Sequence, residues 1–422
     1  MGRPVPASSC GDGPEEMDIM SSSSVRQFVT TSDIVRIVLG WGAFVALLIA
    51  HPLLTAPVPA PLLIVALAAI VAVILVCAFG VVKQAEALAH RLGDPYGSLV
   101  LTLSIVLIEV ILISAVMLGP GEHATIARDS VMAVAMIILN LVIGLALLLG
   151  GIRHRGMAHN RTGTSAYLAM LVVLTALAFG LPALIGREGS YTVAQEIPIV
   201  VITVCLYGFF LFRQMGAQAT DFMEVDQRPA SSSPTAEGFN GFRRRESAEN
   251  LLASTSSQHG VTRGIRDVLR EHRTEVIVRL ALLVVTVIPI VLLSHDMAAL
   301  LDDGLGRLGA PTALAGVLIA AIVFLPESIT AVRAALGGEA QRVVNLCHGA
   351  LVSTVGLTIP AVLVIGMLTG QTVILAETPA DLLLLAVTLL LSIGTFASKR
   401  VTATHGAAHL ALFAVYVVVL FS

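Results

Sequence analysis

The chain has few of the residues that mark soluble enzymes, secreted domains or nucleic-acid-binding proteins. Only 13% of its 422 residues are charged, 5% are aromatic and one is Trp. Its net charge of −3 lacks the basic excess typical of nucleic-acid binding, so we predict no nucleic-acid partner. The four cysteines are scattered, and three of them lie inside apolar segments. We therefore expect neither a disulfide framework nor a zinc site.

The N-terminal stretch lacks a long apolar run. Residues 1–33 are polar, with four consecutive serines at 21–24. A secretory signal peptide needs an apolar core of about 7 to 15 residues, which is absent here. We therefore predict that 1–33 is a disordered cytoplasmic segment and not a cleaved signal peptide.

Apolar residues, in contrast, are abundant. They make up 56% of the chain, and the mean hydropathy is +0.91. A soluble protein of this size has no means to bury so much apolar surface. Segments long enough to span a bilayer recur eleven times, which predicts an all-α polytopic membrane protein with about eleven transmembrane helices. These segments are 34–52, 61–82, 98–118, 130–150, 165–185, 196–212, 276–294, 311–335, 343–368, 380–397 and 402–421.

Basic residues gather in alternate connections between these segments. The intervening connections are neutral or acidic, as at Asp303 and Glu377. By the positive-inside rule, the N-terminus is predicted to be cytoplasmic and the C-terminus external. The basic residues on the predicted cytoplasmic side, apart from those of the long polar stretch, are Lys83, Arg91, Arg153, Arg155, Arg161, Arg333, Arg342, Lys399 and Arg400.

A long polar stretch divides the chain into two halves. Residues 213–274 are rich in serine and charge, and we predict that they form a cytoplasmic, mostly disordered linker. The first membrane bundle is then 34–212, with six helices, and the second is 275–422, with five.

Each bundle carries one glutamate in the middle of a spanning segment. Glu109 lies in 98–118 and Glu327 in 311–332, and neither stretch contains another charged residue. The second stretch is followed directly by Arg333. A charged side chain at the bilayer centre costs roughly 3 kcal/mol, so its default interpretation is a substrate, ion or proton site. The alternative is a protonated carboxyl group that is hydrogen-bonded between helices. Two such residues at matching places favour the functional interpretation.

The two halves also share a weak internal match. Residues 128–147 align without gaps to 342–361, which pairs Asn140 with Thr354. With the predicted topology, the glutamate helix runs outward in one half and inward in the other. Inverted repeats with ligands at the midplane are typical of secondary transporters.

The polar residues near the two glutamates suit a hard cation. Two carboxylates supply four oxygens, and Asn140, Ser353 and Thr354 are candidate auxiliary ligands. Pro326 removes one helical hydrogen bond just before Glu327, so either a local unwinding or a simple kink is expected there. Burial and mutual repulsion oppose ionisation of both carboxyl groups. Protons and a cation can therefore neutralise the site in turn, which is what an antiporter requires.

Two histidines are candidates for a proton relay. His348 lies early in the helix that carries Ser353, and His409 lies in the last helix together with His405. A buried histidine is more often a polar group that is hydrogen-bonded within its bundle, and that interpretation stays open for both.

At these residues the chain resembles the ChaA-type cation/proton antiporters of the calcium/cation antiporter superfamily. The resemblance covers roughly 34–421 without the linker, and it implies one extra N-terminal helix followed by two inverted five-helix repeats. It also implies that Glu109 and Glu327 bind the exchanged cation and protons, with Asn140, Ser353 and Thr354 as further ligands. The matching segments are DPYGSLVLTLSIVLIEVILISAVM (94–117), FLPESITAVRAAL (324–336), QRVVNLCHGALVSTVGLTIPAVLVIG (341–366) and HGAAHLALFAVYVVVL (405–420).

We therefore expect a multi-pass antiporter of the inner (plasma) membrane that exchanges calcium for protons by alternating access, with sodium and potassium as further candidate cations. The chain is predicted not to be an enzyme and to need no cofactor, because the cation is its cargo. A transporter dedicated to monovalent cations is the nearest alternative. An intramembrane hydrolase would need a constellation such as HExxH, which is absent, and a channel would need a Gly-rich filter. The oligomeric state is not predicted.

Overall fold

The computed structural model describes residues 29–54, 58–92, 96–117, 124–216, 218–224, 273–311 and 313–422. They are almost entirely helical. In the first half the elements are α2 (Thr31–Ala50), η1 (His51–Leu53), α3 (Ala60–Leu92), α4 (Tyr96–Met117), α5 (Ile126–Met136), η2 (Ile137–Val142), α6 (Ile143–His154), β1 (Met157–Ala158), α7 (Arg161–Thr175), η3 (Ala176–Gly180), α8 (Leu181–Ile185), α9 (Val193–Met215) and η4 (Ala219–Phe222). In the second half they are α12 (Arg273–Leu308), α13 (Ala313–Gly337), α14 (Ala340–Thr369), α15 (Pro379–Ala397), β2 (Arg400–Val401) and α16 (Ala403–Leu420).

Every apolar segment that predicted a spanning helix is helical. Ten helical spans among the described residues are long and apolar enough to cross a membrane, and the 22-residue α4 occupies the remaining predicted segment. Local sequence signals mark several ends. The Asn160 side chain accepts from the backbone N–H groups of Thr162 and Gly163 at the start of α7, and α14 ends at Gly370, whose φ of 73° suits glycine. The prediction of an all-α polytopic membrane protein is confirmed.

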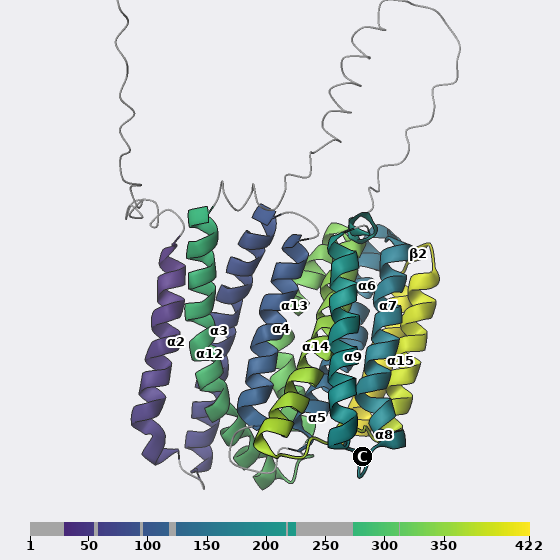
Figure 1. Ribbon diagram of the computed structural model, residues 1–422. Coiled ribbons are helices and arrows are strands. Elements are labelled where there is room, and N and C mark those ends of the chain that lie inside the picture. The colour runs from purple at the N-terminus through teal and green to yellow at the C-terminus, as the bar shows by residue number, and fades with distance from the viewer. Residues whose placement is uncertain are drawn as a thin grey trace, which may run out of the picture.

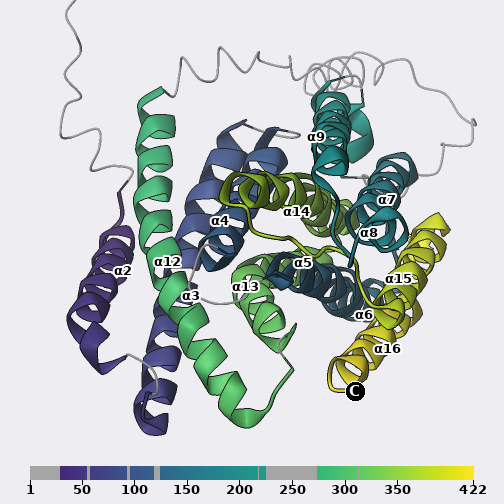
Figure 2. The ribbon, with the colours of Figure 1, turned by 60° about the horizontal axis from the view of Figure 1, so that its bottom comes forward.

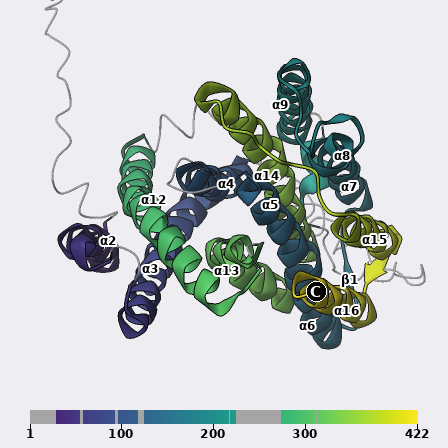
Figure 3. The ribbon, with the colours of Figure 1, turned by 90° about the horizontal axis from the view of Figure 1, so that it is seen from below.

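The helices stand side by side, and those of the two halves are interleaved: α12 lies between α2 and α3 in the view of Figure 1. Seen from below, α5, α13 and α14 lie centrally, whereas α2 lies at the edge of the bundle, where it packs on α3 and α12 (Figure 3). The packing is repeated between the halves, because α4 packs on α14 as α13 packs on α5 and α6, and α14 packs on α9 as α6 packs on α16. Figure 2 shows α3 and α12, the first helices of the two repeats, lying against each other. This is the arrangement of one extra helix and two five-helix repeats.

The two repeats are inverted. In Figure 1, α9 ends and α12 begins at the upper side, and α16 ends at the lower side, where the C-terminus is marked. Because the chain crosses from side to side with each span, α4 and α13 run in opposite directions. Strand β1 pairs antiparallel with β2, which joins the α6–α7 and α15–α16 connections on the upper side. The basic connections named above lie on this one side.

Two helices are interrupted where the sequence predicted continuous spans. The segment 130–150 contains the π-helix η2, and 165–185 contains the π-helix η3. In the second half, α13 is instead unbroken through Pro326, so the local unwinding considered there is wrong. The hydroxyl of Thr330 donates to the carbonyl oxygen of Pro326 at 3.1 Å, within a turn that remains helical. This bond does not replace the one that Pro326 lacks, because the carbonyl group left without an N–H donor is that of Ile322, one turn earlier.

The predicted linker lies mainly outside the described residues, as does most of the predicted disordered N-terminus, 1–33. The first part of 213–274 is nevertheless folded, because α9 continues to Met215 and η4 follows at Ala219–Phe222. The second bundle begins with α12 at Arg273, close to the predicted boundary.

The α6 and α16 helices cross at very short range. A Cβ atom on Gly406 would lie 2.6 Å from the carbonyl oxygen of Gly144, so only glycine fits at this crossing. Close approach at small residues is the usual way in which helices associate in membranes. The crossing holds α16, which carries His409, against the helix that follows Asn140.

Candidate cation and proton site

The two intramembrane glutamates are brought together between the halves. Glu109 on α4 is 3% exposed and Glu327 on α13 is 7% exposed. The two carboxyl groups are near enough to interact electrostatically. The antiparallel helices α4 and α13 both pack on α14, so each places one buried carboxyl group in the interior of the bundle.

Thr354 is the one predicted auxiliary ligand that bonds a glutamate. Its hydroxyl, on α14, donates to Glu109 Oε2 at 2.5 Å. Glu109 Oε1 and both oxygens of Glu327 have no hydrogen-bond partner within the described residues. Buried carboxyl oxygens that lack a donor are costly, so these three oxygens call for protons or a cation. Carboxylate oxygens beside a hydroxyl are the ligands that hard cations prefer.

Asn140 belongs to a different polar cluster, between the first half and the last two helices. Its amide nitrogen donates to Thr388 Oγ1 at 2.9 Å, and its Oδ1 lies 3.3 Å from His409 Nδ1. His409 Nε2 is in turn 3.2 Å from Thr395 Oγ1. Asn140 thus begins a buried chain of polar groups that runs along α15 and α16. No hydrogen bond joins Asn140 to either glutamate in the described part of the chain.

Ser353 and His348 also have surroundings of their own. Tyr207, on α9, donates its hydroxyl to Ser353 Oγ at 2.9 Å. His348 stands among aromatic rings, 5.0 Å from the ring of Phe396 and 6.3 Å from that of Tyr167. Neither ring nitrogen of His348 has a hydrogen-bond partner of standard geometry within the residues described. His409 is therefore part of a hydrogen-bonded chain from Asn140 to Thr395, whereas His348 is not.

The sequence reasoning missed several members of these clusters. Tyr207 stands out by no motif. Thr388, Ser392 and Thr395 do carry a signal, because they recur at helical spacing on α15 and are all buried. A polar stripe of this kind on an apolar helix indicates polar partners on the helices that face it. The π-helical turn η2, which carries Asn140, is a local geometry that is frequent at functional sites.

No three His, Cys, Asp or Glu side chains converge to hold a metal ion among the described residues. In the described part of the chain, the candidate site is therefore two buried carboxyl groups, one of which accepts a hydrogen bond from the Thr354 hydroxyl. Together with the inverted repeats and the mid-helix positions of both glutamates, this composition is typical of secondary transporters.

Comparison with known proteins identifies the family. The family model described as sodium/calcium exchanger protein matches residues 62–216 and 278–422, which cover most of both bundles. The chain belongs to this family.

Relatives extend over most of the chain. It is 36% identical over 341 residues to the "Putative ionic transporter y4hA" of Sinorhizobium fredii, covering 80% of this chain and 83% of that protein. It is 30% identical over 349 residues to the sodium-potassium/proton antiporter ChaA of Escherichia coli, covering 83% and 87%. The solved structure of native YfkE matches 92% of this chain and 99% of its own, with a TM-score of 0.60 and 16% identity. At that identity the likeness supports the fold alone.

Proposed function

We propose that this chain is a secondary antiporter that exchanges cations for protons through Glu109 and Glu327. The single observation that carries the proposal is their joint burial, with three carboxyl oxygens that lack a hydrogen-bond donor. Membership of the exchanger family supports it, as does the relative named sodium-potassium/proton antiporter. The same features support a transporter rather than an enzyme.

Exchange follows from competition for one pair of carboxyl groups. When the site holds protons, both groups are neutral and tolerate burial. When a cation binds, it replaces the protons and takes the carboxylate oxygens as ligands, with Thr354 completing one side. The two states are mutually exclusive, and alternation of the inverted repeats exposes the site to each face of the membrane in turn. Because protons and cation compete, raising the pH favours the cation.

Calcium is the proposed principal cation, with sodium and potassium as alternatives. Two carboxylates balance one divalent ion or two protons, which favours calcium on charge alone. The named activity of the Escherichia coli relative favours monovalent cations instead. We place the transporter in the plasma membrane, with the basic side toward the cytoplasm and cations, protons and the bilayer as its partners.

The Asn140, His409 and Thr395 chain is the proposed proton branch. It is hydrogen-bonded throughout, and the His409 imidazole, like the Thr395 hydroxyl, can both donate and accept. Asn140 and Ser353 are proposed to stabilise the helices around the site through their hydrogen bonds with Thr388 and Tyr207. In this conformation they are not direct ligands.

Glutamine substitution at each carboxyl group tests the proposal. Glu109→Gln and Glu327→Gln keep nearly the same volume but cannot ionise, so each should abolish cation-driven proton flux. The measurement is proton movement in everted membrane vesicles on separate addition of calcium, sodium or potassium. The cation that evokes flux in the wild type decides between the calcium and monovalent alternatives.

Glu377→Gln is the matched control, because Glu377 is also buried at 7% exposure but lies in the α14–α15 connection, away from the pair. It should retain exchange. Wild-type flux in either site variant, present at normal membrane levels, would refute the shared-site mechanism.

A further inference from the structure

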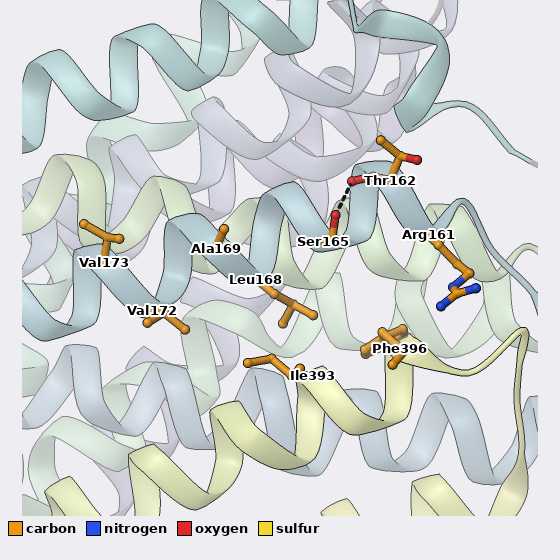
Figure 4. Close-up of a pocket in the computed structure, with 10 residues that line it drawn as sticks. Arg161, Thr162, Ser165, Leu168, Ala169, Val172, Val173, Ile393 and Phe396 are labelled. Atoms are coloured by element: carbon orange, nitrogen blue, oxygen red, sulfur yellow. Dashed lines mark hydrogen bonds between the residues drawn. The ribbon is translucent and has the colours of Figure 1, made fainter.

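A cavity of about 860 Å³ opens between α7 and α15, apart from the carboxyl pair. Its size falls within the range of about 300 to 1,000 Å³ that is usual for ligand pockets. Figure 4 shows Leu168, Val172 and Ile393 along its walls, with Arg161 and Phe396 at one end. Val172 and Ile393 are 40% and 42% exposed, so the cavity opens to the surface that faces lipid in a spanning bundle.

The two ends of the cavity differ in chemistry. Arg161 and Thr162 stand at the first turn of α7, followed by Ser165, whose hydroxyl donates to the Thr162 carbonyl oxygen at 2.8 Å. From Leu168 onward the lining is apolar. The groove therefore has a cation and hydroxyl groups at the end near the membrane surface and apolar walls toward the bilayer interior.

The polar end is positively charged, and no acidic residue lines the groove to neutralise it. Arg161 makes no ion pair or hydrogen bond through its guanidinium within the described residues. Two further basic residues come close after the other wall in the sequence: Lys399 is two residues beyond the lining residue Ala397, and Arg400 pairs with Ala158 in the short β1–β2 sheet. Neither has an ion-pair partner in the described ranges. This basic end faces the side of the membrane where the basic connections gather.

We propose that this groove is a binding site for one anionic phospholipid of the leaflet on the basic side. Its phosphate lies against the Arg161 guanidinium and the Thr162 hydroxyl, and one acyl chain fills the apolar part between Val172 and Ile393. Basic pockets between transmembrane helices favour anionic head groups by charge, and apolar walls favour a lipid over a free phosphate ion. A zwitterionic lipid would leave the basic end without net neutralisation.

The site has a structural consequence for the polar cluster. Phe396 lines the groove, and the preceding residue, Thr395, bonds His409. A lipid held between α7 and α15 therefore stabilises the position of the helix that carries Thr388 and Thr395. This consequence concerns stability and does not require the exchange function.

Lipid-dependent stability of the purified full chain tests the site. The thermal midpoint in detergent is measured with phosphatidylglycerol, with phosphatidylcholine and with inorganic phosphate, and bound lipid is counted by native mass spectrometry. Phosphatidylglycerol alone should raise the midpoint and remain bound. Because one cation near an anionic surface contributes about a fivefold factor in affinity, Arg161→Ala should weaken phosphatidylglycerol binding about fivefold, and Arg161→Lys should largely retain it.

Two further variants keep the test decisive. Ala169→Trp fills the exposed groove without a change of charge and should also prevent retention of the lipid. Arg187→Ala removes an exposed arginine on the opposite side of the bundle and should leave lipid binding unchanged. Equal stabilisation by phosphatidylcholine or by inorganic phosphate would overturn the proposal. So would unaltered lipid binding in both Arg161→Ala and Ala169→Trp, or loss of the lipid effect on deletion of 229–258, which would assign the lipid to the basic run of the linker.

Discussion

At the scale of single residues, Thr354 and Ser353 are neighbours in sequence that are both predicted as auxiliary ligands, but their hydrogen-bond partners differ. Thr354 donates to Glu109, whereas Ser353 accepts from Tyr207. A hydrogen bond to a charged group is worth about 1.5 kcal/mol or more, so Thr354→Ala should weaken apparent cation affinity about tenfold or more. Thr354→Ser keeps the hydroxyl and should restore most of it.

Ser353→Ala is the matched control and should have a smaller effect, because it removes a bond between neutral groups. Cation-concentration series of proton flux in vesicles measure both variants. Equal losses of affinity for the two alanine substitutions would contradict a direct role for Thr354.

The buried side chain of Glu377, in the α14–α15 connection, predicts that the stability of the folded protein depends on pH. Burial raises the pKa of Glu377 to about 8, outweighing Arg128, while Asp381 and Asp129 add repulsion. The folded state therefore holds a proton that the unfolded state releases above its ordinary pKa of about 4.5. Its stabilising contribution is complete below pH 4.5 and is lost as the pH rises to about 8.

Glu377→Gln, which stays neutral, should consequently match the wild type in thermal midpoint near pH 5 and exceed it by pH 9. The difference is limited to a few kcal/mol, because one pKa unit corresponds to about 1.4 kcal/mol. Thermal denaturation of the purified protein across that pH range measures it. A constant offset between the two proteins at all pH values would argue against titration of Glu377 as the cause.

At the scale of elements, the short helix η4 is an integral part of the bundle. Phe222 is 3% exposed and packs edge-on against Tyr167, with ring centroids 5.2 Å apart. Its carbonyl oxygen accepts from Asn345 on α14 at 2.6 Å. Phe222→Ala should therefore cost about 3 to 5 kcal/mol of stability.

Met223, the next residue, is 38% exposed, and Met223→Ala should change stability by less than about 0.5 kcal/mol. The comparison of thermal midpoints is a test of whether the end of α9 and η4 belong to the folded bundle. Equal thermal midpoints for the two variants would show that Phe222 contributes nothing to the stability of the folded bundle.

The same elements show what hydropathy can and cannot predict. The lipid interior forces each long apolar segment into a helix, so the spanning helices follow from sequence, whereas a site shared by Glu109 and Glu327 stays a prediction. The hydrogen bond from Asn140, in the π-helical turn η2, to Thr388 does not, because Thr388 is 248 residues away in the sequence. Local polarity likewise predicts that Phe222 belongs to the linker, because the residues that it contacts, Tyr167 on α7 and Asn345 on α14, are distant in the sequence.

At the scale of the whole molecule, the fold places the ends of the two repeats on opposite sides. The α9 helix ends on the side where the basic connections gather, and α16 ends on the other side (Figure 1). Moving lysine and arginine across a membrane is unfavourable, so the basic side is expected to stay cytoplasmic. That orientation sets which face of the carboxyl pair meets the cytoplasm in each state of the transport cycle.

Reporter fusions test this orientation directly. A reporter fused after Ser422 should read external, and one inserted near Ser232 should read cytoplasmic. Two internal controls use the connections that flank α13. An insertion after Gly309 should read external, and one after Gly338 should read cytoplasmic. Both positions lie in left-handed glycine turns between helices, where an insertion does not interrupt a helix. The opposite readings at these two sites follow from a single crossing by α13, the helix of Glu327. If Ser422 and Ser232 reported the same side, the antiparallel placement of the two glutamates in the membrane would be wrong, and with it the symmetry on which alternating exposure of the site depends.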